Sequence, residues 1–226
     1  MSKPIRAIVI DLEGAAMPMI FLTGTLTPLA REKLGAFIAA HAEEEEVEEA
    51  LEETGRLMGG FDLKPSEAEA LLLRWMKQDR KATPLKFLQG RIWWEAREAG
   101  ALQVEFYEDA AAALKAWAAA GLRLSVYSSQ SQEAQKMLLE HTPYGDLTGF
   151  FEGFLDTTLG QKTEPGSYRD LAERLALPAG AILVLSGNEE ELDAAQSAGL
   201  ATARVMREGG ETSGHAASAD FASLQF

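Results

Sequence analysis

An apolar segment near the start of the chain ends in two closely spaced carboxylates. The segment Ile5–Ile10 contains a single charged residue, and Asp11 and Glu13 follow it directly. A nearly continuous apolar run of this length is typical of a buried parallel strand. In open α/β sheets, reactive groups lie just beyond the carboxyl ends of such strands. We therefore expect Asp11 and Glu13 to face a crevice, although a turn that simply ends a strand would also account for an Asp at this point.

The second half of the chain alternates between apolar strand patterns and amphipathic helix patterns. This alternation begins near Ala110 and predicts an α/β fold with a doubly wound parallel sheet. The expected strands cover 122–127, the region of Gly153 and Phe154, 182–185 and 202–206, and the expected helices between them cover 133–140, 168–175 and 190–198.

A block of helical patterns, residues 17–100, separates the first strand from the rest. Helix starts are marked by Pro28, Pro65 and Pro84, because proline is favoured in the first turn of a helix. We expect this block to be a cap inserted into a core made of residues 1–16 and 101–226. Within it we expect the pair Trp93 and Trp94 to pack in the core.

Two further segments carry weaker patterns. The acidic run 43–49, broken only by Val47, is interpreted as a solvated helix face or a flexible connection rather than as an acidic binding site. The stretch 209–219 is rich in Gly, Ser and Ala, and we expect it to be irregular.

Composition excludes several classes of protein. The chain of 226 residues contains no Cys, which rules out a thiol nucleophile or a thiolate metal site and favours the reducing cytoplasm. No run approaches the roughly 18 apolar residues that span a bilayer, so we expect no membrane partner. The formal net charge of −14 opposes a general grip on nucleic acid, which needs clustered cations. A small substrate is the expected partner.

Polar side chains follow the other predicted strands as well. Ser128 and Ser129 follow one strand, Lys162 lies in a later loop, and Ser186 follows another strand. This set suits hydrolysis of a phosphate ester, in which Asp11 attacks phosphorus, hydroxyls and amides hold oxygens, and a Lys neutralises charge. Mg²⁺ held by carboxylates would complete such a site. Each residue alone is more often a turn residue, a helix cap or a solvated side chain.

These residues also carry a resemblance to a known family. The sequence resembles the acireductone synthases, or enolase-phosphatases, of the haloacid-dehalogenase superfamily. The resemblance covers nearly the whole chain and implies a haloacid-dehalogenase-like Rossmannoid core with an inserted helical cap. The matching segments are 11–14, 79–83, 88–90, 121–124, 127–129, 134–136, 144–147, 156–158 with Gly160 and Lys162, and 191–195.

The resemblance implies a Mg²⁺-dependent phosphoric monoester hydrolase of methionine salvage. Such an enzyme enolises 2,3-diketo-5-methylthiopentyl-1-phosphate and then removes its phosphate through an aspartyl-phosphate intermediate. By position, Asp11 would be nucleophile and metal ligand, and Glu13 would serve acid/base chemistry and the metal. Ser128 and Ser129 would bind phosphate, and Lys162 would balance charge. The resemblance also implies a monomer, and it offers Lys81, Lys86 and Gln89 as cap contacts to substrate, although a solvated helix surface would explain either Lys.

The chain departs from the family pattern around the expected crevice. Ala15 and Ala16 stand where the family has two Thr, and Gln130 replaces a Gly beside the Ser pair. Gly187 replaces an Asp that binds Mg²⁺ in the family, which puts the activity in question. The segment 23–27 lacks the charged residues expected there. Possible compensating ligands are Asn188, Glu189 and Glu190, although acids also stabilise a helix start.

Three functions therefore stay open. The first is a working phosphatase of the acireductone synthase type. The second is a catalytically impaired relative with a degenerate metal site, which binds a phosphorylated ligand or a protein partner. The third is an enzyme that keeps enolisation with weak dephosphorylation, or that acts on another phosphoester.

Overall fold

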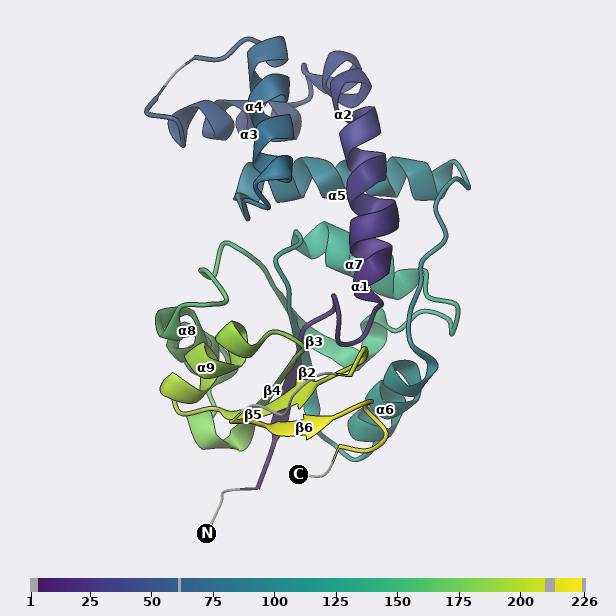
Figure 1. Ribbon diagram of the computed structural model, residues 1–226, viewed down its shortest axis with the longest axis vertical. Coiled ribbons are helices and arrows are strands. Elements are labelled where there is room, and N and C mark those ends of the chain that lie inside the picture. The colour runs from purple at the N-terminus through teal and green to yellow at the C-terminus, as the bar shows by residue number, and fades with distance from the viewer. Residues whose placement is uncertain (1–3, 61, 210–213, 225–226) are drawn as a thin grey trace. The chain divides into compact units, whose positions relative to one another are not determined.

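A computed structural model describes residues 4–60, 62–209 and 214–224 of the chain (Figure 1). It divides into two compact units, which are described separately. The α/β unit comprises Met1–Met19 and Val104–Phe226, and the helical unit comprises Ile20–Gln103.

The α/β unit is built on one parallel sheet of six strands. Their order is β3-β2-β1-β4-β5-β6, so β1 lies in the interior of the sheet between β2 and β4. All four residues of β1 are buried, as the apolar segment at the start of the chain predicts. The strands are β1 Ala7–Ile10, β2 Arg123–Tyr127, β3 Phe151–Leu155, β4 Ile182–Ser186, β5 Ala201–Val205 and β6 Ala216–Ser218.

Helices cover both faces of this sheet. Figure 1 shows α8 and α9 on one side of the strands and α6 on the other. Because successive side chains of a strand alternate between faces, Ala7 and Val9 pack with Leu171 of α8 and Leu192 of α9. The predicted doubly wound α/β fold is confirmed. The helices are α6 Glu108–Ala119, α7 Gln132–Glu140, α8 Pro165–Leu175 and α9 Glu189–Ser197, with short 3₁₀ turns η2 Thr148–Phe150 and η3 Ala179–Ala181.

The helical unit contains helices only in the residues that the structure describes. Proline occupies the first turn of three of them, as expected from Pro28, Pro65 and Pro84. Trp93 is fully buried, and its Nε1–H donates to the carbonyl oxygen of Leu26 at 2.7 Å. The elements are α1 Met19–Phe21, the π-helical turn η1 Leu22–Leu26, α2 Thr27–His41, α3 Glu45–Arg56, α4 Pro65–Lys77 and α5 Thr83–Glu98.

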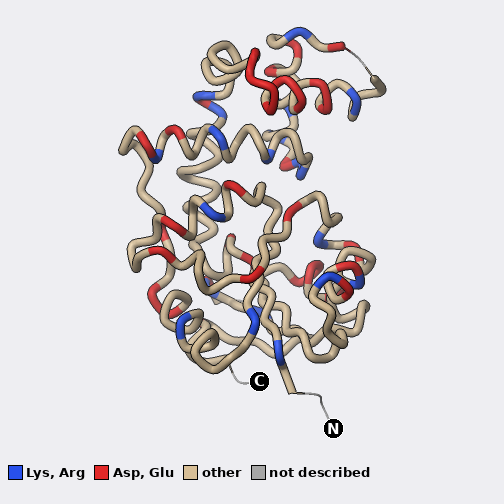
Figure 2. Tube along the Cα trace, turned by 180° about the vertical axis from the view of Figure 1, so that it is seen from behind, with Lys and Arg blue, Asp and Glu red and all other residues tan. Residues whose placement is uncertain are grey.

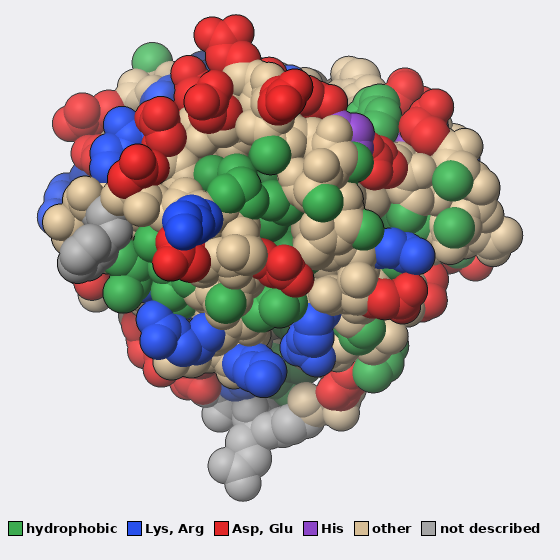
Figure 3. Space-filling model, turned by 90° about the horizontal axis from the view of Figure 1, so that it is seen from above, with side chains coloured by type: hydrophobic (Ala, Val, Ile, Leu, Met, Phe, Trp, Pro, Cys, Tyr) green, Lys and Arg blue, Asp and Glu red, His purple; other side chains and the backbone are tan. Residues whose placement is uncertain are grey.

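The acidic run 43–49 lies at and within the start of α3 (Figure 2). Val47 points into the core of the unit, whereas the glutamates on either side of it are exposed. The solvated-face interpretation is therefore confirmed. Figure 3 shows one face of the molecule, on which acidic side chains are spread with basic side chains between them.

Three expectations from the sequence are wrong. Residues 216–218 form strand β6 beside β5, although 209–219 was expected to be irregular; residues 210–213 lie outside the described part of the chain. Trp94 is 41% exposed, because the helix turns it away from the core side on which Trp93 lies. Lys86, offered as a cap contact with a solvated helix surface as the alternative, is buried, so that alternative is wrong.

No helix in the described ranges is long and apolar enough to cross a membrane.

Candidate active site

Asp11 lies at the carboxyl end of β1. Its backbone N–H donates to the carbonyl oxygen of Leu185 in β4 at 2.9 Å, which extends the sheet ladder by one residue. The chain then reverses at Gly14, whose φ of +82° lies in the left-handed region that favours glycine. Asp11 is only 7% exposed. The fold therefore holds the Asp11 carboxylate at the carboxyl end of the sheet, where little water reaches it.

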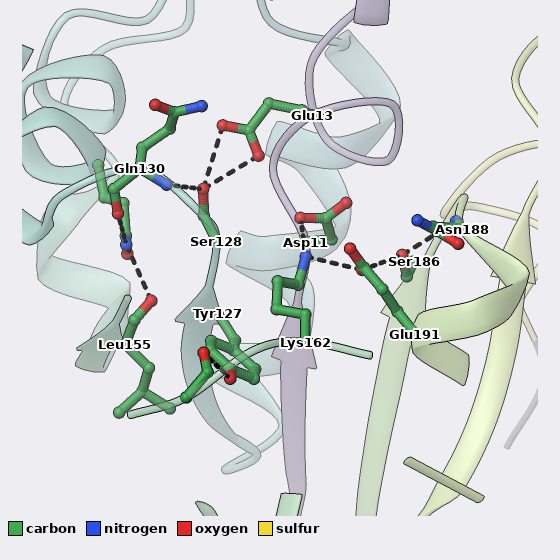
Figure 4. Close-up of polar contacts among 12 residues, drawn as sticks. Asp11, Glu13, Tyr127, Ser128, Gln130, Leu155, Lys162, Ser186, Asn188 and Glu191 are labelled. Carbon is green, nitrogen blue, oxygen red and sulfur yellow. Dashed lines mark hydrogen bonds and ion pairs between the residues drawn. The ribbon is translucent and has the colours of Figure 1, made fainter. Parts of the chain in front are cut away.

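Lys162 is the cation paired with Asp11. Its Nζ lies 2.5 Å from Oδ1 of Asp11 and 2.7 Å from Oε2 of Glu191 (Figure 4). Glu191 lies in the first turn of α9, and its Oε2 also accepts a hydrogen bond from Oγ of Ser186 at 2.8 Å. Since β1 and β4 are adjacent and parallel, Asp11 and Ser186 both lie at the carboxyl end of the sheet. One ammonium group thus joins two carboxylates.

The loop that carries Lys162 is fixed by close packing. Gly160 has a φ of +138°, and a Cβ atom at this position would lie 2.2 Å from Oγ of Ser167. The hydroxyl of Tyr127 donates to the carbonyl oxygen of Gly160 at 3.0 Å, and the hydroxyl of Ser167 donates to that of Gln161 at 2.8 Å. A glycine is required here, and the loop conformation directs Lys162 toward the end of β1.

The buried charges shift one another's protonation. Burial raises the pKa of Asp11 well above its usual range, Lys162 counters part of that rise, and Glu191 and Glu13 add to it. For Lys162, burial acts to lower the pKa, but Asp11 and Glu191 outweigh burial and raise it. Lys162 therefore remains an ammonium group at neutral pH and neutralises one oxygen of Asp11.

Glu13 and Ser128 form the second half of the site. Oγ of Ser128 donates to the Glu13 carboxylate, at 3.0 Å from Oε2 and 3.1 Å from Oε1, and both residues are buried. The backbone N–H of Ser128 donates to the carbonyl oxygen of Leu155 at 3.1 Å, because β2 and β3 are adjacent. The predicted phosphate-binding hydroxyl thus also orients the predicted acid/base carboxylate.

The loop after Ser128 leads into α7. Ser129 is half-buried, and Ser131 caps the helix by accepting a hydrogen bond from the N–H of Ala134 at 3.3 Å. Backbone N–H groups at the start of a helix favour an anion. The Ser pair, with this helix start behind it, provides donors suited to phosphate oxygens.

The side chains present do not fit a metal site built on three ligands. Among the residues that the structure describes, no group of three or more carboxylate or imidazole side chains is placed to hold a metal ion. Lys162 takes one oxygen of Asp11 and one of Glu191, and Gly187 has no side chain to offer. Of the Mg²⁺ ligands implied by the family resemblance, this chain keeps the carboxylates of Asp11 and Glu13 and lacks the one expected at position 187.

The three candidate compensating residues lie at the start of α9. The side chain of Asn188 caps this helix by accepting a hydrogen bond from the N–H of Glu190 at 3.0 Å. Glu189 pairs with Arg204 at 3.1 Å, and Glu190 is exposed. The structure shows none of them in contact with Asp11.

The cap candidates lie in the helical unit. Lys81 is partly exposed and pairs with Asp79 at 2.5 Å. Lys86 and Gln89 are buried on α5, and Oε1 of Gln89 has no hydrogen-bond partner among the described residues.

Two residues of the site were not predicted from the polar residues that follow strands in the sequence. Glu191 contacts Lys162 from the first turn of α9. Acidic residues are common in the first turn of a helix because they interact favourably with the helix dipole, so the residue type alone was no reason to assign Glu191 to the site. Its position five residues after Ser186 was the available signal. Gln130, noted only as a replacement for Gly, is fully buried beside Ser128.

A parallel sheet with a carboxylate at the end of its first strand, paired with a Lys from a later loop, defines the class of protein. The model of the haloacid dehalogenase-like hydrolases matches residues 22–199 of the chain. Two curated relatives, both named enolase-phosphatase E1, resemble the chain over nearly their whole lengths. The relative from Xanthobacter autotrophicus is 60% identical and covers 97% of this chain and 98% of its own length.

The second relative, from Pseudomonas syringae pv. syringae, is 47% identical over 94% of this chain and 93% of its own length. Among solved structures, the UTR4 protein (unknown transcript 4 protein) from Saccharomyces cerevisiae has a TM-score of 0.76 and 27% identity, covering 97% of this chain and all of that one. The chain belongs to the enolase-phosphatase family of the haloacid dehalogenase-like hydrolases.

Proposed function

We propose that this chain enolises and dephosphorylates 2,3-diketo-5-methylthiopentyl-1-phosphate, the reaction implied by its family. The observation that carries the proposal is the contact of Lys162 with Asp11, which neutralises one oxygen of the carboxylate placed to attack phosphorus. Family membership supports the substrate, a small phosphate ester with two adjacent carbonyl groups.

In the proposed phosphate-transfer step, Asp11 is the nucleophile. Oδ2, the oxygen that Lys162 does not hold, attacks phosphorus, and the P–O bond to the leaving group breaks. The leaving oxygen takes the proton that Glu13 gained in the preceding enolisation, and an aspartyl phosphate remains. Water then attacks phosphorus, its proton passes to a carboxylate, and Asp11 is regenerated. Lys162 offsets the negative charge that two anions bring together.

The enolisation step uses the other half of the site. A carboxylate removes a proton from the carbon next to a carbonyl group, and the carbonyl oxygen becomes an enolate oxygen. Glu13 suits this role because the hydroxyl of Ser128 fixes its orientation.

The family pattern includes dependence on Mg²⁺. This chain, however, has Gly187 at the position where the pattern has a metal-binding Asp. The experiment measures phosphate release from the diketo phosphate across a Mg²⁺ titration, for the unmodified chain, Asp11→Asn and Gly187→Asp. We expect release by the unmodified chain and none by Asp11→Asn. No release from the unmodified chain at any Mg²⁺ concentration would contradict the proposal.

The Gly187→Asp variant places a side chain close to two backbone carbonyl groups. A Cβ atom at this position would lie 3.3 Å from the carbonyl oxygen of Val205 and 3.4 Å from that of Gly14, so these groups must shift by a few tenths of an ångström to admit it. Activity that appears only in this variant would support the second function, a catalytically impaired relative that binds a phosphorylated ligand or a protein partner. The missing ligand at Gly187 is the observation that favours it.

Further parts of the proposal rest on the family and the composition. They are a monomeric state, a place in the cytoplasm, and a role for the helical unit as a cap that contributes Lys81, Lys86 and Gln89 to substrate binding. Sedimentation of the purified chain tests the monomeric state. The effect of Gln89→Leu on KM tests the role of the helical unit in substrate binding.

A further inference from the structure

The side-chain amide of Gln130 is buried without a partner. The residue is fully buried, and neither Nε2 nor Oε1 makes a hydrogen bond to any residue that the structure describes. A buried polar group left without a partner costs about 1–3 kcal/mol relative to a paired one. An amide with both ends unpaired at this point of the fold therefore calls for a partner that comes from outside the chain.

The backbone of Gln130 is held from both sides. Its N–H donates to Oγ of Ser128 at 3.0 Å, and its carbonyl oxygen accepts from Nε2 of Gln135 at 2.8 Å. Nε2 of Gln135 also donates to the carbonyl oxygen of Leu155 at 2.9 Å, which ties the loop to the end of β3. The direction of the Gln130 side chain is thus set by a fixed main chain and not by a mobile loop.

The amide lies beside the acid/base half of the site. Ser128 is the common neighbour: its Oγ accepts from the N–H of Gln130 and donates to the carboxylate of Glu13. Figure 4 shows the Gln130 amide and the Glu13 carboxylate on the same side of Ser128, beyond the end of β2. A ligand atom that meets the Glu13 carboxylate would therefore lie on the same side of Ser128 as the amide.

The chemistry of an amide selects the kind of ligand atom. Phosphate oxygens have other donors in Lys162 and the backbone N–H groups at the start of α7, which leaves the Gln130 amide for a different oxygen of the ligand. Its N–H can donate to a carbonyl oxygen, and it bonds the enolate oxygen formed from that carbonyl group more strongly still. Ala15 and Ala16, which follow the nucleophile, have no hydroxyl groups to take that role.

We propose that Nε2 of Gln130 donates a hydrogen bond to a carbonyl oxygen of the substrate and so selects phosphate esters that carry a carbonyl group. This inference rests on the proposed function and names the contact that distinguishes its substrate from simple phosphate esters. When Glu13 removes a proton from the adjacent carbon, the C–H electron pair forms the C=C bond and the carbonyl π electrons move to oxygen. The amide N–H then stabilises the enolate oxygen.

Equilibrium binding tests the proposal without requiring turnover. The probes are 2,3-diketo-5-methylthiopentyl-1-phosphate and pentyl phosphate, which has no carbonyl group, titrated calorimetrically into the full chain carrying Asp11→Asn. The comparison variant adds Gln130→Met, which keeps the length of the side chain and removes its polar atoms. We expect a five- to tenfold rise in Kd for the diketo phosphate and less than a twofold change for pentyl phosphate.

Equal changes in Kd for the two probes would overturn the proposal, and so would an unchanged Kd or no measurable binding for the diketo phosphate. A second variant, Gln130→Ala, repeats the comparison in case the Met side chain does not fit. We also expect Gln130→Met to raise the melting temperature of the free protein, because it removes two unpaired polar atoms from a buried position. A lower melting temperature with equal loss for both probes would mean a merely structural role.

The two hypotheses fail separately. Absence of phosphate release by the unmodified chain contradicts the proposed function. It leaves the binding comparison intact, because that comparison measures only how the chain discriminates a carbonyl group.

Discussion

At the scale of single residues, the site is organised around two hydrogen-bonded pairs. Asp11 pairs with Lys162, and Glu13 pairs with Ser128. These four residues follow strand ends, so their meeting could be predicted from the sequence, because carboxyl ends of parallel strands share one edge. Glu191 could not be predicted in this way, since it comes from a helix and its contact depends on how α9 packs beside β4.

Glu191 provides the first prediction. Replacing it by Gln removes one of the two carboxylates that fix Lys162, so the ammonium group is held less firmly against Asp11. We expect Glu191→Gln to lower kcat/KM for phosphate release about tenfold. Glu190→Gln is the matched control, because Glu190 is the preceding residue of the same helix turn and is exposed. Equal activities of the two variants would show that Lys162 does not need its second partner.

The protonation of Asp11 provides the second prediction. Burial raises the pKa of Asp11, and the negative charge of Glu191 adds to the rise. Since attack on phosphorus requires the ionised carboxylate, kcat/KM should fall with decreasing pH at a pH well above 3.8, the ordinary Asp value. In Glu191→Gln this acid limb should move to lower pH, because a like charge is removed. A pH profile of kcat/KM for phosphate release, measured for the unmodified chain and for Glu191→Gln, gives both the position of the acid limb and its shift. An acid limb that moves to higher pH in the variant would contradict the assignment of this limb to Asp11.

At the scale of elements, helix starts are well predicted where proline marks them, as at α4 and α5. Strand β6 is missed because Ala216–Ser218 is short and has neither β-branched nor aromatic residues; it forms because β5 offers an edge to pair with. The burial of Lys86 is likewise set by neighbouring helices rather than by its residue type. The local sequence pattern thus predicts long helices and strands. Tertiary packing determines whether a short strand forms and whether a single side chain is buried.

The junction of α3 and α5 provides the third prediction. Arg91 on α5 donates to Glu44 at 2.8 Å and to Glu46 at 3.0 Å. We expect Arg91→Gln to lower the melting temperature by roughly 1–3 °C. Arg97→Gln, on the same helix, is the control, because Arg97 makes no ion pair with the described residues. Scanning calorimetry of both variants measures the difference.

The same junction has a predictable pH dependence. Hydrogen bonds from His41 and Arg91 lower the pKa of Glu44 below its ordinary value of 4.5. A lowered pKa gives stabilisation that is present above the ordinary value and is lost as the pH falls through the lowered one. The difference in melting temperature between the unmodified chain and Arg91→Gln should therefore shrink below pH 4.5. A difference that grows on acidification would contradict this pairing.

At the scale of the whole molecule, an anionic substrate must approach a chain with a formal net charge of −14. Like charges slow association, and salt screens that repulsion. We expect the association rate constant of the diketo phosphate to rise between 10 and 150 mM KCl, as measured by stopped-flow mixing with Asp11→Asn in the absence of divalent cations. A rate constant that falls with salt would indicate that local cations such as Lys162 dominate the approach instead.

The two-sided anchoring of the Gln130 main chain has a consequence for protein engineering. Because Ser128 and Gln135 hold the main chain through its own N–H and carbonyl groups, these contacts do not use the side chain of residue 130. A library at this one codon, restricted to side chains no larger than Gln because the position is fully buried, can therefore vary the chemistry beside Glu13 without removing the contacts that hold the loop.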